Sequence, residues 1–445
     1  METLPPEHLR AVQLLKLKRI VVWAYRNSPF YRKKFDRANL VPHDIQELDD
    51  IKKLPLTTKA EWLAAQGERD VDFGPLLATS ESEVVRYHQT SGTTGKPIRL
   101  AFSQRDWNWW MECWAHGLTA CGLSATDRVL VCFPFNLFVG WWGGLDTARL
   151  LGSRVYSGGG MTTEQRLQVV RDHEITTLMA SPSYLLHLAR VAESALGWRT
   201  QDLHVRKLIC GAEPGGSIPS IRRCLQEAWR AEVFDHLGAS EVGPWGYECE
   251  AHPGGVHICE GFFLMEFIDP ETGDPAPPGD LAKLVVTALE KNAQPVIRFD
   301  AKDLVRVADR PCPCGRTYRW VEGGLLGRAD DLLKVRGVLF SPRAVEDVVR
   351  SSHPSAEYRV FVSRRAAMDE VTLKMEMAAG SDSGPRVVDD LVLALKLKTN
   401  LRFHVELCAP GTFPRQEIKT KRVIDLRTRE VERVVSADSR PGSGN

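Results

Sequence analysis

The middle of the chain alternates short apolar runs with longer amphipathic stretches. Runs such as RVLVCF, ITTLMA and KLIC are separated by stretches such as SYLLHLARVAESAL, in which apolar residues recur at helical spacing. This alternation is typical of buried strands that are joined by covering helices. It predicts an α/β fold with a helix-covered, mostly parallel sheet, whose ligands lie at the carboxyl ends of the strands.

The expected elements follow one another in a regular order. Strands, several of them ending in turns or loops, are expected in residues 128–135, 153–160, 175–181, 205–216 and 231–241, and helices in 183–196 and 221–231. Glycine-rich loops at 92–95, 211–216 and 238 fall at predicted strand ends. We therefore expect these loops to meet at one edge of the sheet.

The pattern changes near Ile258. FFLMEFIDPETGDPAPPGDLAKLVVTAL predicts strand, turn, loop and strand, hence a separate small antiparallel sheet. Beyond Arg328, strands are expected at 357–363, 371–377 and 403–408 and a helix at 385–399, which together form a small α+β unit. We expect an N-terminal domain over 1–329, a C-terminal domain over 330–432, and a disordered polar tail over 433–445.

Composition and charge narrow the classes of function. The chain has 445 residues with 43% hydrophobic residues, and its 58 Lys plus Arg balance 57 Asp plus Glu. This balance argues against a nucleic-acid or membrane-surface partner, since both favour a basic face. The uncharged stretch 129–145 is interrupted by Pro134 and several glycines. It is therefore interpreted as a buried strand followed by a pocket-lining turn.

The ends and the cysteines favour a cytoplasmic protein. METLPPEHLR lacks a basic region followed by an apolar run, so no signal peptide is expected, and free thiols follow. Six of the ten cysteines lie in apolar surroundings and are expected in the core: Cys113, Cys121, Cys132, Cys210, Cys224 and Cys408.

Residues 90–97, TSGTTGKP, concentrate hydroxyls, glycines and a lysine. A glycine-rich turn lets backbone N–H groups converge on an anion, and Lys96 adds charge. The stretch fails the Walker motif, because two residues separate its glycines and Pro97 replaces the metal-binding hydroxyl. It indicates a phosphate loop of another kind, or a plain surface turn.

Several motifs together resemble one family. YHQTSGTTGKP is similar to the phosphate loop of the adenylate-forming superfamily, and further segments resemble the phenylacetate–CoA ligase family. These segments are NSPFYRKKFDRANLVPHDIQELDDIKKLPLTTK, HLGASEVG, PVIRFDAKDL and GRADDLLKVRGVLFSP. The resemblance implies an ATP-dependent ligase that adenylates an aromatic carboxylic acid and transfers the acyl group to coenzyme A.

The resemblance also implies roles for individual residues in nucleotide binding. Catalytic roles fall on Glu241, which would bind Mg²⁺, and on Thr94, Lys96 and Lys419, although Lys421 is a rival to Lys419 because Ile418 replaces the usual glycine. Residues implied to bind ATP or AMP are Ser91, Gly92, Thr93, Gly95, Gly211, Ala212, Glu213, Pro214, His236, Leu237, Gly238, Ser240, Asp303 and Arg328. Asp330 matches the hinge of a mobile C-terminal domain, and Gly337 would lie on the CoA side.

The acid is expected to bind after the strand RVLVCF. The segment PFNLFVGWWGG combines aromatic rings with glycines, which suits a flat slot for benzoate, aminobenzoate or phenylacetate, although such rings also fill cores. The resemblance favours Phe135, Gly140 and Trp141 lining the slot, with Ala212 and Ala239 at its floor.

A cysteine and histidine group follows in ECEAHPGGVHICE and RPCPCGRT. Together these segments can supply a tetrahedral Cys₃His zinc site, which would be structural because four protein ligands leave no open position. Relatives that carry such a site match Cys249, His257, Cys312 and Cys314, with His252 as the alternative histidine. Reduced surface cysteines are the plainer interpretation.

Other hypotheses remain open from the sequence. The enzyme could load a carrier protein or another acceptor instead of CoA, and the family leads us to expect a homodimer. A zinc-containing nucleic-acid-binding module is the alternative from a different class, which the near-zero net charge disfavours.

Overall fold

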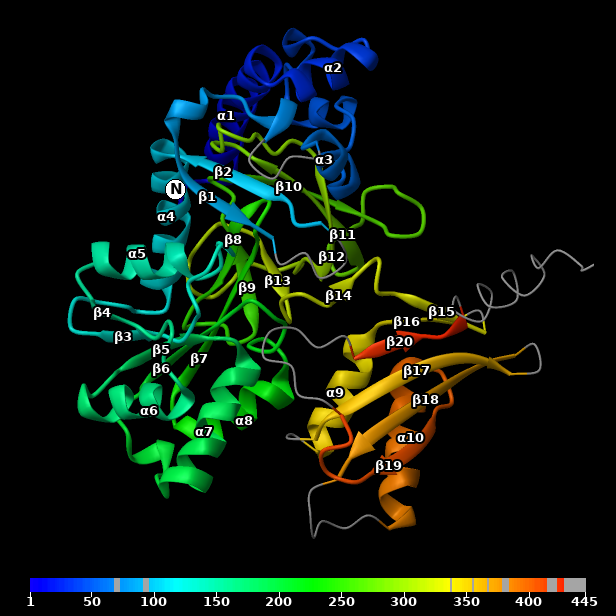
Figure 1. Cartoon of the computed structure of the whole chain (residues 1–445). Coiled ribbons are helices and arrows are strands. Elements are labelled where there is room, and N and C mark those ends of the chain that lie inside the picture. Colours follow the sequence, from blue (N-terminus) through cyan, green and yellow to red (C-terminus); the bar gives the residue numbers. More distant parts are fainter. Residues whose placement is uncertain are drawn as a thin grey trace, which may run out of the picture. The chain divides into compact units, whose positions relative to one another are not determined.

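The computed structural model describes residues 1–67, 73–90, 96–336, 338–353, 356–365, 368–377, 384–413 and 422–427. Two compact units divide the chain, Met1–Leu326 and Gly327–Asn445, and each is described by itself (Figure 1). The predicted tail at 433–445 lies outside the described residues.

The N-terminal unit begins with a helical segment. It contains α1 (Pro6–Asn27), α2 (Pro29–Arg37) and α3 (Lys59–Ala65). Pro29 begins α2, where its fixed φ suits the first turn, and the Ser28 side chain accepts a hydrogen bond from the Tyr31 N–H. Ile20 of α1 and Tyr31 and Phe35 of α2 are buried in one apolar cluster, which joins the two helices.

A two-stranded antiparallel hairpin follows. It pairs β1 (Val84–Gln89) with β2 (Arg99–Ser103), and α4 (Gln104–Ala120) continues from β2. A capping box between Ser103 and Asp106 begins α4. Trp107, Trp110 and Trp114 are buried on this helix, so α4 forms a large part of the main core.

The large sheet has eight strands in the order β13-β9-β8-β7-β6-β5-β3-β4. Its parallel part consists of β4 (Arg154–Ser157), β3 (Arg128–Val131), β5 (Thr177–Ala180), β6 (Lys207–Cys210) and β7 (Glu232–Ala239). Its antiparallel part adds β8 (Gly243–Glu248), β9 (Gly255–Ile258) and β13 (Trp320–Glu322). The predicted mostly parallel α/β sheet is confirmed.

Four helices accompany the parallel strands: α5 (Trp142–Leu150), α6 (Thr163–Asp172), α7 (Pro182–Leu196) and α8 (Pro219–Trp229). The sequence explains the limits of α7: Ser181 caps it, Pro182 is its first residue, and Gly197 ends it at a φ of 66°. Leu185 and Leu188 of α7 and Leu225 of α8 are buried under the sheet in a second core cluster.

One strand is shorter than predicted. The sequence suggested a strand over 128–135, but β3 ends at Val131. The Phe133 N–H turns back to the Val131 carbonyl, and Pro134 has no N–H to continue a ladder. The chain therefore leaves the sheet early, and Phe135 takes a φ of 49°.

The predicted small antiparallel sheet is also present in the N-terminal unit. It pairs β10 (Phe263–Ile268), β11 (Leu281–Ala288) and β12 (Phe299–Arg306). The PETGD turn was placed correctly between the first two of these strands, where Asp269 accepts hydrogen bonds from the Glu271 and Thr272 N–H groups.

The C-terminal unit is an α+β domain, as predicted. Its four-stranded sheet has the order β19-β18-β17-β20, and α9 and α10 pack against each other. The elements are β14 (Gly327–Arg328), β15 (Leu333–Val335), β16 (Val338–Phe340), α9 (Pro342–Ser352), β17 (Tyr358–Arg365), β18 (Met368–Glu376), α10 (Pro385–Thr399), β19 (His404–Cys408) and β20 (Val423–Asp425).

The six cysteines that were expected in the core differ in their burial. Cys113, Cys121, Cys132 and Cys210 are buried as expected, but Cys224 and Cys408 are only partly buried. Cys224 lies in the amphipathic helix α8 and Cys408 ends a strand, so the apolar neighbours in sequence face other directions.

Among the described residues, every helix is too short or too polar to reach across a bilayer.

Candidate active site

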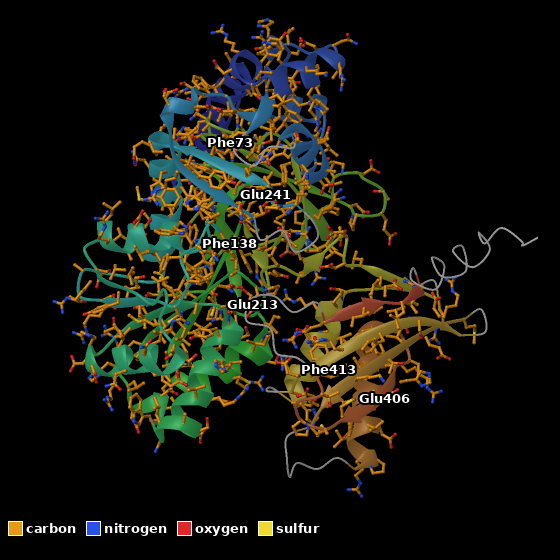
Figure 2. The ribbon with its side chains drawn as sticks, in the orientation of Figure 1. Phe73, Phe138, Glu213, Glu241, Glu406 and Phe413 are labelled. Carbon is orange, nitrogen blue, oxygen red and sulfur yellow. The ribbon has the colours of Figure 1, made fainter. Side chains whose placement is uncertain are left out.

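Three loops gather at the carboxyl edge of the parallel strands. They follow β3, β6 and β7, and β6 pairs with β7 so that Cys210 lies opposite Asp235. Figure 2 labels Phe138, Glu213 and Glu241, one residue from each loop. The sequence placed its glycine-rich and aromatic segments at this edge, which is where open α/β sheets bind ligands.

The hairpin that carries the predicted phosphate loop has a closed stem. The Thr90 N–H donates to the Ile98 carbonyl at 2.9 Å, and the Thr90 hydroxyl accepts from the Ile98 N–H at 2.9 Å. Lys96 is exposed just inside this stem. Five predicted loop residues lie outside the described residues: Ser91, Gly92, Thr93, Thr94 and Gly95.

Two buried glutamines anchor the strand that leaves this loop. The Arg99 N–H donates to Gln66 Oε1 at 2.9 Å, and the Ala101 N–H donates to Gln294 Oε1 at 2.9 Å. Both side chains occupy N–H groups of β2 that do not pair with β1. The base of the phosphate loop is thereby fixed to two distant segments of the chain.

Glu241, the predicted Mg²⁺ ligand, is 8% exposed and contacts two lysines. Its carboxylate Oε1 lies 3.0 Å from Lys59 Nζ, and its backbone carbonyl accepts a hydrogen bond from Lys291 Nζ at 2.6 Å. Neither lysine was expected beside Glu241 from the sequence. Lys59 stands in the quoted segment LPLTTK, so the family resemblance marked the segment but gave the side chain no role.

Lys291 is the more unusual of the two lysines because it is 0% exposed. Burial lowers the pKa of Lys291 to about 8, although the carboxylates of Asp106 and Glu241 favour its charged form. Lys59 comes from the first turn of α3, and its side chain is 46% exposed. One cation is thus fixed in the protein, and the other can exchange with solvent.

The predicted nucleotide loop follows β6. Ala212 has a φ of 70°, and a Cβ on Gly211 would lie 3.2 Å from the His236 carbonyl oxygen and from the Trp141 ring. Glycine at 211 therefore permits a close approach of three segments. Glu213, whose nucleotide-binding role stays a prediction, accepts a hydrogen bond at Oε1 from the Ser183 N–H at 2.8 Å, at the start of α7.

His236 uses its backbone and its ring in different places. Its carbonyl lies next to Gly211, whereas its ring stacks on Trp114 of α4 with centroids 3.6 Å apart. Burial lowers the pKa of His236 to about 3, so the ring is neutral. Of the neighbouring predicted residues, Leu237 is buried in β7, Gly238 and Ala239 complete that strand, and Ser240 follows it.

Asp303, the predicted ribose ligand, lies in β12 and is 6% exposed. Its sequence neighbour Asp300 is occupied by Lys283 Nζ at 3.1 Å and Lys302 Nζ at 3.2 Å. The choice of Asp303 as the ribose ligand stays a prediction.

The aromatic segment after β3 forms a ring cluster. Phe135 lies edge-on to Trp142 with centroids 5.0 Å apart, and Trp141 is buried against Trp114 at 5.6 Å. A Cβ on Gly140 would meet the rings of Phe133 and Phe138 at 2.9 Å, so a side chain here would have to displace these rings. Trp141 belongs both to the core and to the edge beside Gly211, which the sequence could not separate.

The predicted residues of the C-terminal unit are only partly described. Arg328 and Asp330 form an ion pair with Nε and Oδ1 at 2.9 Å. Gly337, Lys419 and Lys421 lie outside the described residues, so the expected CoA-side glycine and both candidate lysines stay predictions.

The predicted metal group comes together. The ligand atoms of Cys249, His257, Cys312 and Cys314 all lie within 4.8 Å of one another. His257 Nδ1–H donates to the Tyr318 carbonyl at 3.3 Å, which leaves Nε2 directed at Cys314 Sγ, 3.4 Å away. Burial, together with the neighbouring thiols, raises the pKa of Cys249 to about 12.

His252, the alternative histidine, is placed outside this group. Its ring packs on Trp320 with centroids 4.2 Å apart. The tighter sequence spacing of Cys249 and His252 was therefore misleading, because β9 and β13 pair His257 with Trp320 and bring His257 to the CPCG loop. The fold, and not the spacing, selects the histidine.

The Glu2 carboxylate contacts the loop that carries Cys312 and Cys314. Glu2 Oε2 accepts from Arg316 Nε at 3.0 Å, and the Arg316 N–H donates to Cys314 Sγ at 3.5 Å. His116 Nδ1 also contacts Glu2 at 2.7 Å. The sequence gave no signal for this residue, because its partners are distant in the chain.

Comparison with protein families gives two matches. The profile described as AMP-binding enzyme matches residues 17–288, and the profile described as AMP-binding enzyme C-terminal domain matches residues 337–427. Among curated proteins, the phenylacetate-coenzyme A ligase of Escherichia coli is 34% identical over 435 residues, covering 96% of this chain and 97% of the relative. The phenylacetate-coenzyme A ligase of Pseudomonas putida is 35% identical, with 96% of both chains covered.

Solved structures agree with these matches. A crystal structure of 2-hydroxyisobutyryl-CoA ligase in the postadenylation state with 2-HIB-AMP has a TM-score of 0.88 at 27% identity, covering 98% of this chain and 93% of that one. The anthranilate CoA ligase AuaEII with anthranoyl-AMP has a TM-score of 0.59 at 17% identity, covering 81% of this chain and 69% of that one, and is similar in fold alone.

Proposed function

This chain belongs to the AMP-binding enzyme family, among the phenylacetate–coenzyme A ligases, and we propose that its acid substrate is an aromatic carboxylic acid. The enzyme is an AMP-forming acid–thiol ligase that uses ATP and coenzyme A. The observation that supports an aryl acid is the placement of Trp141 against Gly211, which sets an aromatic segment beside the nucleotide loop.

The reaction has two steps. A carboxylate oxygen attacks the α-phosphorus of ATP, the bond between that phosphorus and the bridging oxygen breaks, and pyrophosphate leaves with the electron pair. The CoA thiolate then attacks the carbonyl carbon, the carbon–oxygen bond to AMP breaks, and acyl-CoA and AMP are released. Both steps bring anions together, so the site has to supply positive charge and N–H donors.

The described residues suit these demands at the nucleotide end. The rigid hairpin stem at Thr90 and Ile98 would present the loop N–H groups to the phosphates, with Lys96 beside them. Gly211 and the His236 carbonyl would flank the base, and Asp303 would accept the ribose hydroxyls. The exposed Lys96 and the loop glycines would release pyrophosphate after the first step.

Glu241 is the proposed ligand for Mg²⁺. Its buried carboxylate already holds one cation, the Lys59 ammonium, which shows that the position tolerates positive charge. Mg²⁺ is bound by one or two carboxylates together with phosphate oxygens, so a single glutamate suits it. When bound, the ion would neutralise phosphate charge, and Glu241 would fix its place.

Zinc is the proposed occupant of the Cys249, His257, Cys312 and Cys314 group. Three sulfurs and one imidazole nitrogen at this spacing suit a tetrahedral structural site, and the Tyr318 carbonyl orients the imidazole. The ion would join β8 and β9 to the CPCG loop. Metal analysis of purified protein, followed by chelation, is expected to give one zinc per chain and a lower Tm without it; an absence of zinc would contradict the proposal.

The substrate proposal is tested by a ligation screen. Purified enzyme with ATP, Mg²⁺ and CoA is offered benzoate, anthranilate, hydroxybenzoates, phenylacetate, cinnamates and 2-hydroxyisobutyrate. We expect acid-dependent pyrophosphate exchange and acyl-CoA formation with an aryl acid. Turnover of 2-hydroxyisobutyrate alone would contradict the aromatic proposal, and accumulation of acyl-AMP with inert CoA would favour a carrier-protein acceptor.

The C-terminal lysines separate the two half-reactions. We propose that Lys419 bridges the carboxylate and the α-phosphate, so Lys419→Ala should lose adenylation selectively and keep thioester formation from supplied acyl-AMP. Lys421→Ala is the matched comparison, two residues along the same segment. If Lys421→Ala alone gives this phenotype, the assignment moves to Lys421. Rotation about Asp330, Gly337 on the CoA side, and a homodimer are further parts of the proposal.

A further inference from the structure

Lys291 is a buried cation to which the proposed reaction gives no role. It lies between β11 and β12 and is 0% exposed. Removing an ammonium from water is costly unless the protein supplies partners, so buried lysines are rare and mark special environments. The surroundings of Lys291 therefore indicate what it does.

Its contacts come from three separate segments. Nζ donates to the Glu241 carbonyl at 2.6 Å and lies 5.4 Å from the ring centroid of Phe102 and 5.8 Å from that of Trp62. The carboxylates of Asp106 and Glu241 are the acidic groups that act on it. The ammonium thus sits on aromatic faces, and its hydrogen bond goes to the backbone of the proposed metal ligand.

The segment that carries Lys291 is held rigidly. Asp106 Oδ1 accepts from the Asn292 N–H at 2.6 Å, and the Ala293 carbonyl accepts from the Ala78 N–H at 2.8 Å. Gln294, also 0% exposed, bonds to β2 below the phosphate loop. A donor mounted on such a segment can define the position of the carbonyl that it binds.

Glu241 therefore has two cationic partners with different properties. Lys291 binds its backbone from a buried, anchored position, and Lys59 binds its carboxylate from the surface of α3. A metal ion competes with Lys59 for the carboxylate but not with Lys291 for the carbonyl. The buried lysine can keep the turn in place while the carboxylate changes partner.

We propose that Lys291 is a positioning residue of the nucleotide–metal site, which acts through the Glu241 carbonyl to direct the Glu241 carboxylate toward the metal-bound phosphates. This inference rests on the proposed function. It concerns the binding of Mg²⁺·ATP and leaves the binding of the adenosine part to other residues.

The chain offers a matched control in Lys207. Its Nζ also donates to a backbone carbonyl, that of Gly122, and its side chain is 14% exposed. Lys207 begins β6 at the amino end of the sheet, opposite the proposed site. Lys207→Met removes a comparable bond, together with an ion pair to Asp127, without touching Glu241.

The test measures nucleotide binding in the absence of acid. Titration calorimetry of wild type, Lys291→Met and Lys207→Met uses ATP with Mg²⁺ and, separately, AMP. We expect Lys291→Met to raise the Kd for Mg²⁺·ATP by about ten-fold or more and to change that for AMP by less than about two-fold. Lys207→Met should leave both values within about two-fold.

A double-mutant cycle decides whether the effect passes through Glu241. In a Glu241→Gln background, Lys291→Met should weaken Mg²⁺·ATP by less than about two-fold, because the carboxylate charge it positions is gone. Lys291→Gln, which keeps an N–H donor, should bind Mg²⁺·ATP better than Lys291→Met and provides the comparison if the methionine variant does not fold.

Three results would overturn the inference: unchanged Mg²⁺·ATP binding in the Lys291 variants, equal losses for Mg²⁺·ATP and AMP, or additive losses in the cycle. A wild-type protein that binds no ATP would instead refute the proposed function. The two failures are therefore distinguishable.

Discussion

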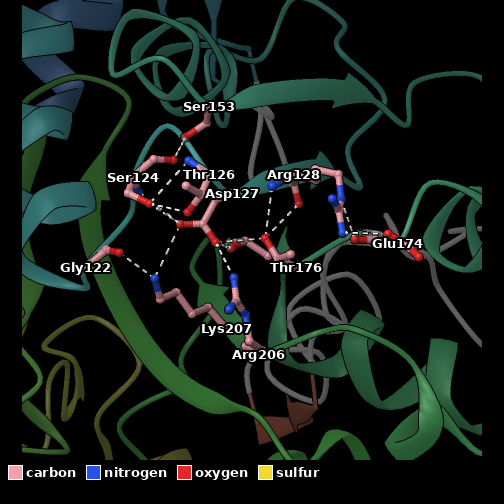
Figure 3. A network of polar contacts seen from close by, with 11 residues as sticks. Gly122, Ser124, Thr126, Asp127, Arg128, Ser153, Glu174, Thr176, Arg206 and Lys207 are labelled. Atoms are coloured by element: carbon pink, nitrogen blue, oxygen red, sulfur yellow. Dashed lines mark hydrogen bonds and ion pairs between the residues drawn. The ribbon is translucent and has the colours of Figure 1, made fainter.

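A buried carboxylate lies at each end of the parallel strands in the eight-stranded sheet, and the two carboxylates differ in their hydrogen-bond partners. At the amino end, Asp127 directly precedes β3 and is 2% exposed (Figure 3). It accepts hydrogen bonds from the Thr176 hydroxyl at 2.8 Å and the Ser124 N–H at 3.0 Å, and Lys207 and Arg206 lie at 3.5 and 3.4 Å. Its partners come from residues at the starts of β5 and β6 and from the turn before β3.

At the carboxyl end, Glu241 is also buried, and its carboxylate pairs with Lys59. Lys59 reaches it from a surface helix with a side chain that is 46% exposed. Left-handed backbone occurs at both ends: Phe135 and Ala212 have φ values of 49° and 70° at this end, and Glu174 has a φ of 45° at the other.

The comparison separates a carboxylate that is held by buried donors from one that we propose binds the metal ion of the reaction. Besides the 64% exposed Arg206, Asp127 has the Thr176 hydroxyl, the Ser124 N–H and the mostly buried Lys207 as partners, so its charge holds neighbouring strand starts together. Glu241 has a fixed partner on its backbone and an exchangeable one on its carboxylate. Burial alone does not distinguish the two carboxylates, but the hydrogen-bond donors that Thr176 and Ser124 hold against Asp127 do.

The largest expected effect sharpens the contrast at the carboxyl end. Glu241→Gln should lower acid-dependent pyrophosphate exchange by about 10²–10³-fold, because a neutral amide is a poor ligand for the metal that neutralises phosphate. The free energy of unfolding should change by less than about 1 kcal/mol, since the Lys59 pair is half exposed. Pyrophosphate exchange kinetics measure the loss of activity, and urea unfolding measures the free energy of unfolding. A variant that is strongly destabilised but keeps its exchange activity would contradict the comparison.

Asp127→Asn should do the reverse. We expect a loss of about 2–3 kcal/mol in the free energy of unfolding, because the amide cannot satisfy the same donors and cations. The kcat of the folded fraction should stay within about two-fold. Urea unfolding and exchange assays test this, and a large kcat loss at full folding would contradict a purely structural role.

The free energy of unfolding at acidic pH gives an independent check on Asp127. Burial by itself would raise the pKa of Asp127, but hydrogen bonds from Thr176 and the Ser124 N–H and the charge of Lys207 outweigh it and leave the pKa below its ordinary value. A lowered pKa adds stability above the unfolded value of about 3.9, and this stability is lost as the pH falls through the folded pKa. The difference between wild type and Asp127→Asn should therefore shrink below about pH 4.

Phe135 tests whether strain accompanies function. Phe135→Gly and Phe135→Ala both remove the ring, and each should raise the KM for the aryl acid by about ten-fold while leaving that for ATP unchanged. Glycine tolerates the φ of 49°. The glycine variant should therefore be more stable than the alanine variant by about 1 kcal/mol. Equal stabilities would show that the left-handed backbone stores no strain.

The smallest effect is expected for a substitution at the amino end of the parallel strands. Thr176→Val keeps the side-chain shape and removes the hydroxyl that binds Asp127. The cost should be about 1 kcal/mol in urea unfolding, the usual value of one hydrogen bond, with normal enzyme kinetics. A cost as large as that of Asp127→Asn would mean that the other partners contribute little.

The sequence was most informative where local pattern decides structure. Apolar runs predicted the parallel strands, and Pro182 with Gly197 marks both ends of α7. Pattern failed where a side chain had two available directions: β3 ends before Phe135, and Cys224 and Cys408 are not fully buried. The nucleotide-binding role expected for Glu213 stays a prediction, and its carboxylate accepts a hydrogen bond from the Ser183 N–H.

By itself, the sequence determined the family, the fold class, and the set of cysteines and histidines from which a metal site could be built. Tertiary structure decided which histidine joins that group, and it brought Lys59 and Lys291 to one glutamate from positions far away in the chain. The physical reason is that periodicity and turn residues act over a few neighbours. The partner of a buried charge is set by how strands and helices pack, which no local pattern encodes.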